Sequence, residues 1–424
     1  MTKRVLVLAL ALMLVVSATV FAAGTQESAK PGEKTKITFW SPFSGGDGDI
    51  MKSIVADFNA QSKTSEVEFL IFKSEEYYTK LMVSVSSNSA PDVAILHLSR
   101  LLEFTSDNLL EPLNKYASAV GMNWGDFSGV LQKAAQIDGN YYAVPLDTHL
   151  LLMHFNTKWL GELGMLDANG KPAMARGEKA FFDYFNAVKG KLGDNQMPLS
   201  GTSQFGLPQY VWYTLLTQYG GEIQNADGTK ATLDTAENKK ALSVMKQMVD
   251  SGIWPKGQKN GAEIFTGFRA TATINGNWGI PIFEKVNGLE FISMPFPQFT
   301  NVNSVYADSH TMVMPTSRQS DAKKQAAMEF MAWMADNTLD WAQAGHIPSK
   351  TKIVDSAEFK ALPYRSEYAK SAEYAHFYPR SLSLTGMIEV VQRELATMIA
   401  GDQDVNTTAA NMQAGYQRLL DQKR

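Results

Sequence analysis

Short runs of strand-forming residues alternate with amphipathic stretches along most of this chain. Residues 36–40 and 67–72 are apolar runs, and between them Ile50, Ile54, Val55 and Phe58 recur at the spacing of one helix face. Residues 77–99 continue with a helix, a serine-rich turn and a short buried strand. The pattern predicts β-α-β units and therefore an α/β fold, with parallel sheets covered by helices.

One apolar run does not fit a single strand. It extends from Tyr141 to Phe155 and is interrupted by Pro145, Asp147 and His149, which predicts a passage of the chain from one domain into another. The proline-rich segment Met294–Phe299 is a second candidate crossover. We therefore expect two α/β domains joined by crossover segments, with a cleft at their junction, where small-molecule sites usually lie.

Length and the first residues add to this picture. A chain of 424 residues is too long for one simple core, which supports two domains. Lys3 and Arg4, an apolar run and then small residues form a signal-peptide pattern over residues 1–23. We expect cleavage after Ala22 or Ala23 and a polar tether over residues 24–36. The chain has no cysteine that could carry a lipid anchor, so we expect a soluble periplasmic protein.

The charge of the exported chain is moderately negative. Removing Lys3 and Arg4 from the 39 basic residues leaves 37 against 43 acidic residues, a formal charge near −6. This balance argues against nucleic acid and against anionic membranes as partners.

Local signatures of catalysis and of metal binding are missing. Residues 201–205 resemble a nucleophile elbow but end in Phe205, and residues 164–171 resemble a phosphate loop with the wrong spacing. No histidines stand at the helical spacing of metal ligands, zinc thiolates need cysteine, and Asp47-Gly-Asp49 is too short for a calcium loop. We therefore expect no enzyme, no metal site and no cofactor.

Aromatic rings stand beside short polar side chains where strands are expected to end. Ligands of open α/β sheets bind at the carboxyl ends of strands. A sugar suits such a lining, because its C–H faces stack on flat rings and its hydroxyls need well-placed donors and acceptors. The candidate residues are Trp40, Phe43, Asp47, His97, Ser99, Asp147, His149, Gln209, Trp212, Asn277, Trp278 and His310, with Asn275 and Asp308 at the same corners.

Several of these residues have a structural alternative. Asp47 in its double-glycine turn serves equally well as turn chemistry, and each histidine taken alone is more often a core or surface residue. Trp278 follows Asn-Gly-Asn at a strand end, which favours ligand contact. Trp333 and Trp341 lie in helical pattern and are expected in the core.

The order of several short segments resembles a known family. "ITFW", "SAPDVAIL", "GNYYAVP", "MHFN", "ATATINGNWG" and "MPTSRQSDAKKQAAMEFMAWM" occur in the order found in family 1 of the extracellular solute-binding proteins of bacterial ABC sugar importers, the maltose-binding-protein-like group. The resemblance covers nearly the whole exported chain. The segment 170–195 departs from the family pattern, which leaves that part of the second lobe open.

The resemblance implies a two-lobe periplasmic binding protein fold with the ligand between the lobes. It implies an N-terminal lobe of residues 37–146 and 298–338 and a C-terminal lobe of residues 147–297 and 339–424. By position it implies sugar contacts at His97, Ser99, Asp147, His149, Gln209, Trp212 and Trp278, and adds Tyr378 near a stacking position. The expected function is capture of a mono- or oligosaccharide by cleft closure and delivery to the permease subunits of an importer, by a monomer.

Two alternatives stay open. A secreted glycoside hydrolase would also carry aromatics and acids, but it needs two carboxyl groups about 5–10 Å apart, and no convincing pair stands out. The same fold could bind a solute other than a sugar. An anionic solute would need Arg or Lys at the strand ends, and none of the corners named above has one.

Overall fold

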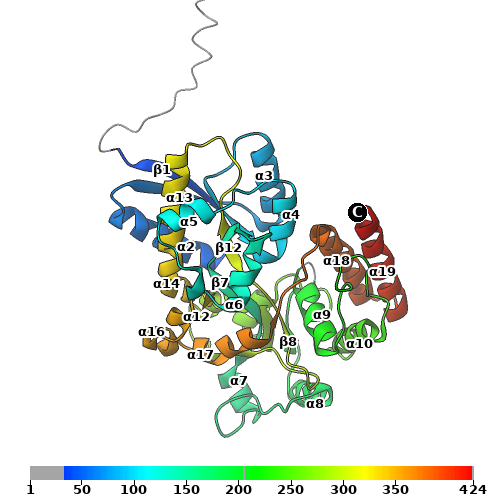
Figure 1. The fold of residues 1–424 in the computed structure, drawn as a ribbon. Helices are drawn as coiled ribbons and strands as arrows, with labels where there is room; N and C mark the ends of the chain where they lie inside the picture. The colour runs from blue at the N-terminus through cyan, green and yellow to red at the C-terminus, as the bar shows by residue number, and fades with distance from the viewer. Residues whose placement is uncertain (1–32, 204–205, 423–424) are drawn as a thin grey trace, which may run out of the picture.

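A computed structural model describes residues 33–203 and 206–422, which form two α/β units (Figure 1). The signal peptide expected over residues 1–23 lies outside the described residues, as does the tether up to residue 32. The expected end of the tether at residue 36 is too late, because strand β1 (Thr35–Ser41) already includes Thr35 and Lys36. No helix within the described ranges is long and apolar enough to cross a membrane.

The first unit is built on a five-stranded sheet with the order β2-β1-β3-β12-β6. β1 runs parallel to β2 (Ser65–Ile71) and β3 (Val93–His97), and β12 (His310–Val313) runs antiparallel to β3 and β6 (Ala143–Pro145). Successive residues of β3 pack into two different hydrophobic cores, one on each face of the sheet. Both faces are therefore covered, as the apolar runs predicted.

Helices from distant parts of the chain cover this sheet. One core collects side chains from α2 (Gly46–Gln61), α5 (Asn114–Ala119), α13 (Asp321–Asp336) and α14 (Thr338–Ala342). The other collects them from α3 (Ser74–Ser86), α4 (Leu101–Ser106) and α6 (Gly129–Ala134). The helix face expected between the first two strands is confirmed, since Ile54, Val55 and Phe58 are buried and Ile50 is half-buried. Trp341 is buried and Trp333 packs against the same core, also as expected.

The second unit is built around one long strand, β7 (Asp147–Asn156), all of whose residues are buried. The sheet has the order β14-β11-β7-β9-β8, and two further strands also pair with β7. The other strands are β8 (Met197–Ser200), β9 (Ala270–Gly276), β10 (Phe291–Pro295), β11 (Val305–Asp308), β13 (Ile347–Pro348) and β14 (Ala375–His376). β7 therefore holds this unit together as its central strand.

Helices surround the second sheet and pack into one large core. They are α7 (Thr157–Glu162), α8 (Glu178–Lys189), α9 (Gly206–Gln218), α10 (Ala236–Asp250), α11 (Gly261–Thr266), α12 (Ile280–Glu284), α18 (Leu384–Ala400) and α19 (Val405–Gln422). Shorter elements complete the chain: α15 (Thr351–Val354), α16 (Ala357–Ala361), α17 (Arg365–Tyr368), the hairpin β4 (Gln136–Ile137) and β5 (Asn140–Tyr141), and the 3₁₀ turns η1 (Leu98–Arg100), η2 (Trp124–Asp126), η3 (Asn277–Gly279) and η4 (Ala369–Tyr374).

The chain passes between the two units at three places. Leu146 packs in the first unit and Leu150 in the second, so the first passage lies at the start of β7, within the expected segment Tyr141–Phe155. The second passage lies between β11 and β12, around Ser309. The third lies between Ala344, in the first core, and Ile347, in the second.

The second crossover expected at Met294–Phe299 is therefore wrong. Strand β10, which ends at Pro295, pairs with β7 in the second sheet, and so does β11, the next strand after this segment. The prolines there interrupt pairing within one sheet instead of marking an exchange between sheets. Residues 305–308 thus lie with the second sheet, whereas the first-lobe range expected to begin at residue 298 includes them, and the return near residue 339 occurs closer to His346.

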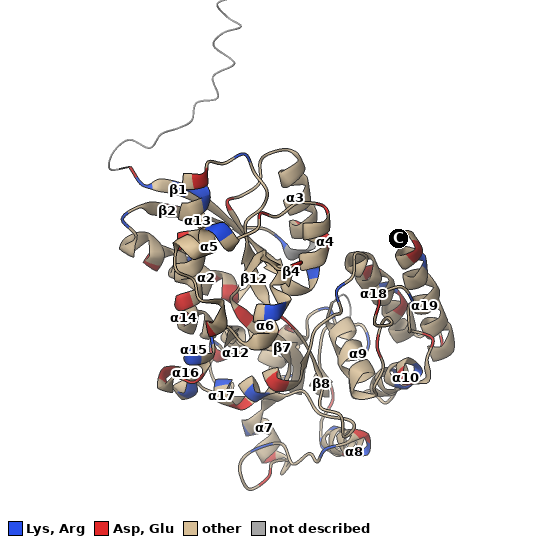
Figure 2. Cartoon of the chain, in the orientation of Figure 1, with Lys and Arg blue, Asp and Glu red and all other residues tan. Residues whose placement is uncertain are grey.

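Charged residues of both signs are interspersed over the two units (Figure 2). Neither unit shows a block of one sign in this view, which agrees with the modest net charge of the sequence.

Candidate functional site

The three passages between the units bring one carboxylate and three histidines together. Asp147 and His149 start β7, His310 starts β12, and His346 directly precedes β13. Their ligand-type atoms all lie within 4.8 Å of one another, and all four side chains are buried. No local spacing in the sequence predicts this group, because its members lie up to about 200 positions apart.

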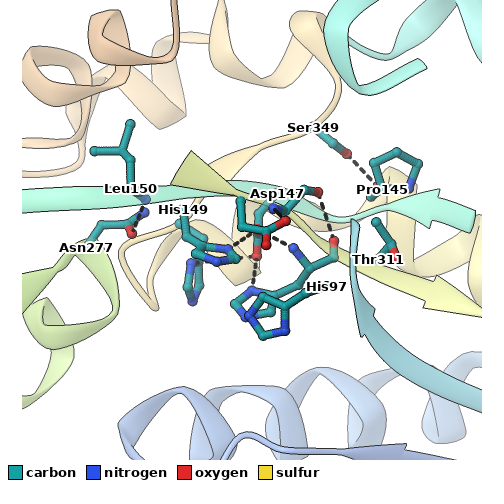
Figure 3. Close-up of polar contacts among 12 residues, drawn as sticks. His97, Pro145, Asp147, His149, Leu150, Asn277, Thr311 and Ser349 are labelled. Carbon is teal, nitrogen blue, oxygen red and sulfur yellow. Dashed lines mark hydrogen bonds and ion pairs between the residues drawn. The ribbon is translucent and has the colours of Figure 1, made fainter. Parts of the chain in front are cut away.

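Asp147 is the centre of the group (Figure 3). Its Oδ2 accepts hydrogen bonds from His310 Nδ1 at 2.8 Å and from Trp341 Nε1 at 2.6 Å. Its Oδ1 accepts one from the backbone N–H of His310 at 3.0 Å and lies 3.2 Å from His149 Nδ1. Burial opposes ionisation of this carboxyl, but the neighbouring His310 charge and these hydrogen bonds hold the pKa of Asp147 well below its usual value.

The histidines differ in charge because their surroundings differ. Burial lowers the pKa of His310, but the adjacent Asp147 carboxylate outweighs it, so the pKa of His310 is raised. Burial lowers the pKa of His149 and lowers that of His346 to about 3, which keeps both rings neutral near pH 7. His310 is therefore the ring that pairs with Asp147 as a cation.

His97 extends the group toward the first unit. Its ring centroid lies 5.2 Å from that of His149 and 4.8 Å from that of His310. Its Nδ1 is hydrogen-bonded to the Tyr78 hydroxyl. Burial, followed by the neighbouring histidines, lowers the pKa of His97 well below its usual value, so this ring is neutral and offers a polar edge beside an aromatic one.

Trp278 and Tyr210 form a half-buried aromatic wall on the second unit, and the buried ring of Tyr306 lies behind Tyr210. Trp278 lies 5.7 Å from His149 and 6.2 Å from Tyr210, measured between ring centroids. Tyr210 in turn stacks on Tyr306 at 4.1 Å with a 9° angle between the rings. Trp278 and Tyr210 are only half-buried, so each ring keeps surface that a ligand can cover.

Gly276 explains the position of the Trp278 ring. A Cβ atom at residue 276 would lie 1.9 Å from Cζ3 of that ring, closer than any real contact. The indole therefore folds back over the glycine at the end of β9. Gly345 makes room for Asn277 in a similar way, because a Cβ atom at residue 345 would lie 2.1 Å from the Asn277 carbonyl oxygen.

Ser99 and Asp308 connect η1 of the first unit to the end of β11. The Ser99 hydroxyl donates to Asp308 Oδ2 at 2.5 Å and its backbone N–H donates to Oδ1 at 3.2 Å. Ser99 lies two residues after His97 in the chain. Asp308 lies two residues before His310, which pairs with His97 where β12 runs beside β3. His97, Ser99 and Asp308 thus form a polar line at the junction.

The glycine-rich first turn of α2, with Gly45 as its N-cap, approaches the second unit. Asp47 accepts hydrogen bonds from the N–H groups of Gly45 at 3.1 Å and Gly48 at 2.9 Å, and burial raises its pKa. A Cβ at Gly46 would lie 3.3 Å from Cβ of Pro281 in α12. The two units therefore approach closely at this turn, and Asp47 mainly holds its own turn.

Several predicted contacts prove to be packing residues. Phe43 is 2% exposed and its ring contacts His310 and Trp341, so it supports the histidines from behind. Trp212 is fully buried and its Nε1 donates to Asn238 Oδ1 at 2.6 Å within the second core. These two rings offer no free face in this structure, which contradicts their expected role as ligand contacts.

Three polar predictions are corrected for the same reason. Asn277 is fully buried: its Oδ1 accepts from the Leu150 N–H, and its Nδ2 donates to the Gly345 carbonyl. Gln209 is also buried and donates to the Tyr378 hydroxyl at 2.6 Å, with Tyr378 itself packed in the second core. The polar atoms of these side chains are hydrogen-bonded to other buried groups of the protein. Trp40 is half-buried, but its ring packs on Phe72, on the α3 side of the first sheet.

The sequence reasoning also missed residues of the site. Tyr78, Tyr210 and Tyr306 come from helical or strand segments whose local pattern shows only amphipathic or apolar character. Arg100 directly follows Ser99, so one of the strand-end corners has a cation that the sequence analysis did not count. Its guanidinium lies 4.2 Å from the centroid of Tyr78, donates to Thr385 and pairs with Glu103 at 3.8 Å.

Two surface cavities lie elsewhere on the second unit. One, of about 420 Å³, is lined by residues between Lys189 and Arg269. The other, of about 230 Å³, is lined by residues that include Trp159 and Phe268. Neither contains any of the predicted site residues, and neither has the convergent aromatic and polar groups of the junction, which remains the better site candidate.

Comparison with known proteins gives a consistent result. Residues 53–366 match the family described as bacterial extracellular solute-binding protein. A maltotriose-binding protein of Pyrococcus abyssi is 20% identical over 353 residues, covering 82% of this chain and 73% of the relative. A diacetylchitobiose-binding protein of Streptomyces coelicolor is 23% identical over 339 residues, covering 75% and 74%.

Solved structures share the two-unit fold. The ABC substrate-binding protein of Listeria monocytogenes in complex with cycloalternan aligns with a TM-score of 0.79 at 19% identity, over 91% of this chain and 99% of that chain. Maltose-bound MalE3 of T. maritima aligns with a TM-score of 0.78 at 18% identity, over 91% and 100%. The expected two-lobe α/β fold is confirmed.

Proposed function

Since the chain belongs to the bacterial extracellular solute-binding proteins, we propose that it captures a carbohydrate at the junction of its two units and delivers it to the permease of an ABC importer. The observation that carries this proposal is the presence at one junction of the half-buried wall of Trp278 and Tyr210 and the polar line of His97, Ser99 and Asp308. Membership of a solute-binding family also sets aside the glycoside hydrolase.

The chemistry of the junction fits a sugar. Indole and phenol faces remove the C–H surface of a pyranose ring from water, which contributes about 25 cal/mol per Å² of apolar area buried. The carboxylate of Asp308 and the hydroxyl of Ser99 can exchange part of their mutual contact for hydroxyls of the ligand. Because these groups are already partly desolvated, a ligand without matching hydroxyls would leave them unpaired.

An anionic solute fits less well. Arg100, the residue after Ser99, is engaged by Glu103, by Thr385 and by the Tyr78 ring. The other cation at the junction, His310, is paired with Asp147. A phosphate ligand would have to break that arrangement. This matters because one structural neighbour with a TM-score of 0.81 is a protein in complex with glycerophosphocholine. The relatives that bind maltotriose and diacetylchitobiose support a carbohydrate, and among carbohydrates an oligosaccharide.

Cleft closure, export to the periplasm and action as a monomer belong to the same proposal. Three connections at one junction allow the two units to rotate about a common line, which is the usual geometry of hinge closure. His97 of the first unit and Trp278 of the second both contact the His149 ring at this junction, so closure would bring groups of both units onto a ligand.

The proposal is tested by a ligand screen. The purified exported chain is melted with maltodextrins, chitooligosaccharides, arabinooligosaccharides, monosaccharides and glycerophosphocholine, each in a concentration series. A carbohydrate at one hundred times its Kd should add about 2.7 kcal/mol to the free energy of unfolding. A shift with glycerophosphocholine and with no carbohydrate would replace the sugar by a phosphodiester solute.

A further inference from the structure

A buried cluster behind the aromatic wall remains without a role in sugar binding. We propose that Asp147, His149, His310 and His346 form a binding site for a divalent transition metal ion of the zinc class, which links the three chain passages between the two units. The proposal goes beyond carbohydrate capture and does not depend on it. It runs against the expectation of no metal site, which rested on local spacing alone.

The composition and spacing of the cluster fit such an ion. Zinc prefers imidazole nitrogen and carboxylate oxygen at about 2.0–2.2 Å, so neighbouring ligands of a tetrahedral site lie about 3.4 Å apart. The distances from the Asp147 carboxylate to Nδ1 of His310, His149 and His346 are 2.8, 3.2 and 3.6 Å, which bracket that value. No pair of ligand atoms is more than 4.8 Å apart, so the widest would have to close by at most about 1.4 Å.

His346 is the independent sign of a missing partner. Its ring is fully buried, and both Nδ1 and Nε2 lack a hydrogen-bond partner. Burying an unpaired polar group costs about 1–3 kcal/mol, and native structures rarely contain one without a reason. Its Nδ1 faces the Asp147 carboxylate at 3.6 Å, too far for a hydrogen bond but suited to sharing a cation with it.

The surroundings supply a second shell. Trp341 stacks on His346 at 4.5 Å with a 16° angle and donates Nε1 to Asp147, so one side chain orients two of the four ligands. The backbone N–H of His310 donates to the other Asp147 oxygen. The carboxylates of Asp47 and Asp308 act electrostatically on His310, which offsets the charge of a bound dication.

Two members of the cluster keep a little exposed surface. His346 and Asp147 are fully buried, whereas 3% of His149 and 7% of His310 is exposed. An ion entering the cluster would meet His149 and His310 first. Because the four ligands belong to all three passages, bound metal would restrict the relative movement of the two units.

The test uses the full exported chain, stripped with a chelator and then titrated with Co²⁺ and Zn²⁺. We expect one Co²⁺ per chain, with the visible absorption of a tetrahedral site, and its displacement by Zn²⁺. His346→Gln should weaken metal affinity more than about one hundred-fold, since loss of even an outer-shell partner costs about 10- to 100-fold. His376→Gln is the matched control, because His376 is partly exposed and lies outside the cluster.

His149→Gln repeats the test in case the His346 variant does not fold, and melting of each variant in chelator shows that it is folded. If the wild type takes up no metal, or if His346→Gln and His149→Gln bind it as tightly as His376→Gln, the cluster is only a hydrogen-bonded network and the proposal is overturned. Sugar affinity measured in chelator is a separate readout, so failure of the metal site leaves the proposed function testable on its own.

Discussion

At the scale of single residues, two tryptophans of the second unit have opposite environments. Trp278 is half-buried beside His149 and Tyr210, while Trp212 is fully buried with its Nε1 on Asn238. The first ring can lose surface to a ligand, and the second has already lost it to the core. Shortening each to alanine should therefore affect different properties.

Trp278→Ala should weaken carbohydrate binding and leave the fold intact. A stacked indole contributes on the order of 1.5–3 kcal/mol through the area it removes from water, or roughly 10- to 100-fold in Kd. The measurement is a calorimetric titration with the sugar found in the screen, together with urea unfolding. Trp159→Ala, a half-buried tryptophan in α7 away from the junction, is the control. Normal binding by an unstable Trp278 variant would place this ring in the core instead.

Trp212→Ala should lower the free energy of unfolding by about 3–5 kcal/mol, the usual cost of emptying a buried tryptophan site. Trp212→Phe keeps most of the volume but leaves the Asn238 oxygen without its donor, which should cost about 1–3 kcal/mol. Both variants should bind the sugar normally at low temperature. A large loss of affinity in well-folded Trp212→Phe would return this residue to the binding site.

At the scale of elements, the end of β9 and the turn η3 act as one unit. Gly276 leaves the space that the Trp278 ring fills, and Asn277 anchors the turn to β7 and to Gly345. The position of the ligand-facing ring is therefore set by residues that do not face the ligand.

Gly276→Ala should displace the Trp278 ring, because the new Cβ would lie 1.9 Å from it. We expect a loss of sugar affinity of about ten-fold or more, on the same area argument. The double variant with Trp278→Ala should bind no worse than Trp278→Ala alone, since both changes remove one interaction. Gly129→Ala in α6, where a Cβ meets nothing within 4 Å, is the control. Additive losses in the double variant would contradict this coupling.

At the scale of the whole molecule, hydrogen bonds join the two units across the junction. The Glu103 carboxylate of α4 accepts from the backbone N–H of Thr385 at 2.9 Å and from its hydroxyl at 2.7 Å, at the start of α18. Arg380 donates to the carbonyl of Ala134 at 3.0 Å. These bonds join the two units away from the chain passages and would be lost on opening.

The sugar should therefore reduce the radius of gyration measured by X-ray scattering. Glu103→Ala should bind the sugar about ten-fold more weakly, roughly 1.4 kcal/mol, because it removes two hydrogen bonds that only the closed arrangement makes. Glu111→Ala, which removes an ion pair to Lys324 within the first unit, should not change the affinity. An identical scattering profile with and without saturating sugar would exclude hinge closure.

Local sequence patterns were sufficient for the elements and for one passage. The spacing of Ile54, Val55 and Phe58 is a property of neighbours on one helix. Pro145 at the end of β6 and the polar residues at the start of β7 interrupt an apolar run, which the local sequence shows directly. The place of Trp278 outside the strand also follows from its near neighbours, because the strand ends at Gly276, two residues before it.

The tertiary structure alone decided which of the remaining candidates face a ligand and which face the core. Trp212 and Trp278 both stand beside polar residues in the sequence, but only packing against α10 buries the first. Asp147 meets Trp341, 194 positions later, and His346 beyond it. Burial and the approach of distant side chains depend on how whole units pack, and a local pattern records only the neighbours along the chain, so the histidine cluster and the second passage could be found only in three dimensions.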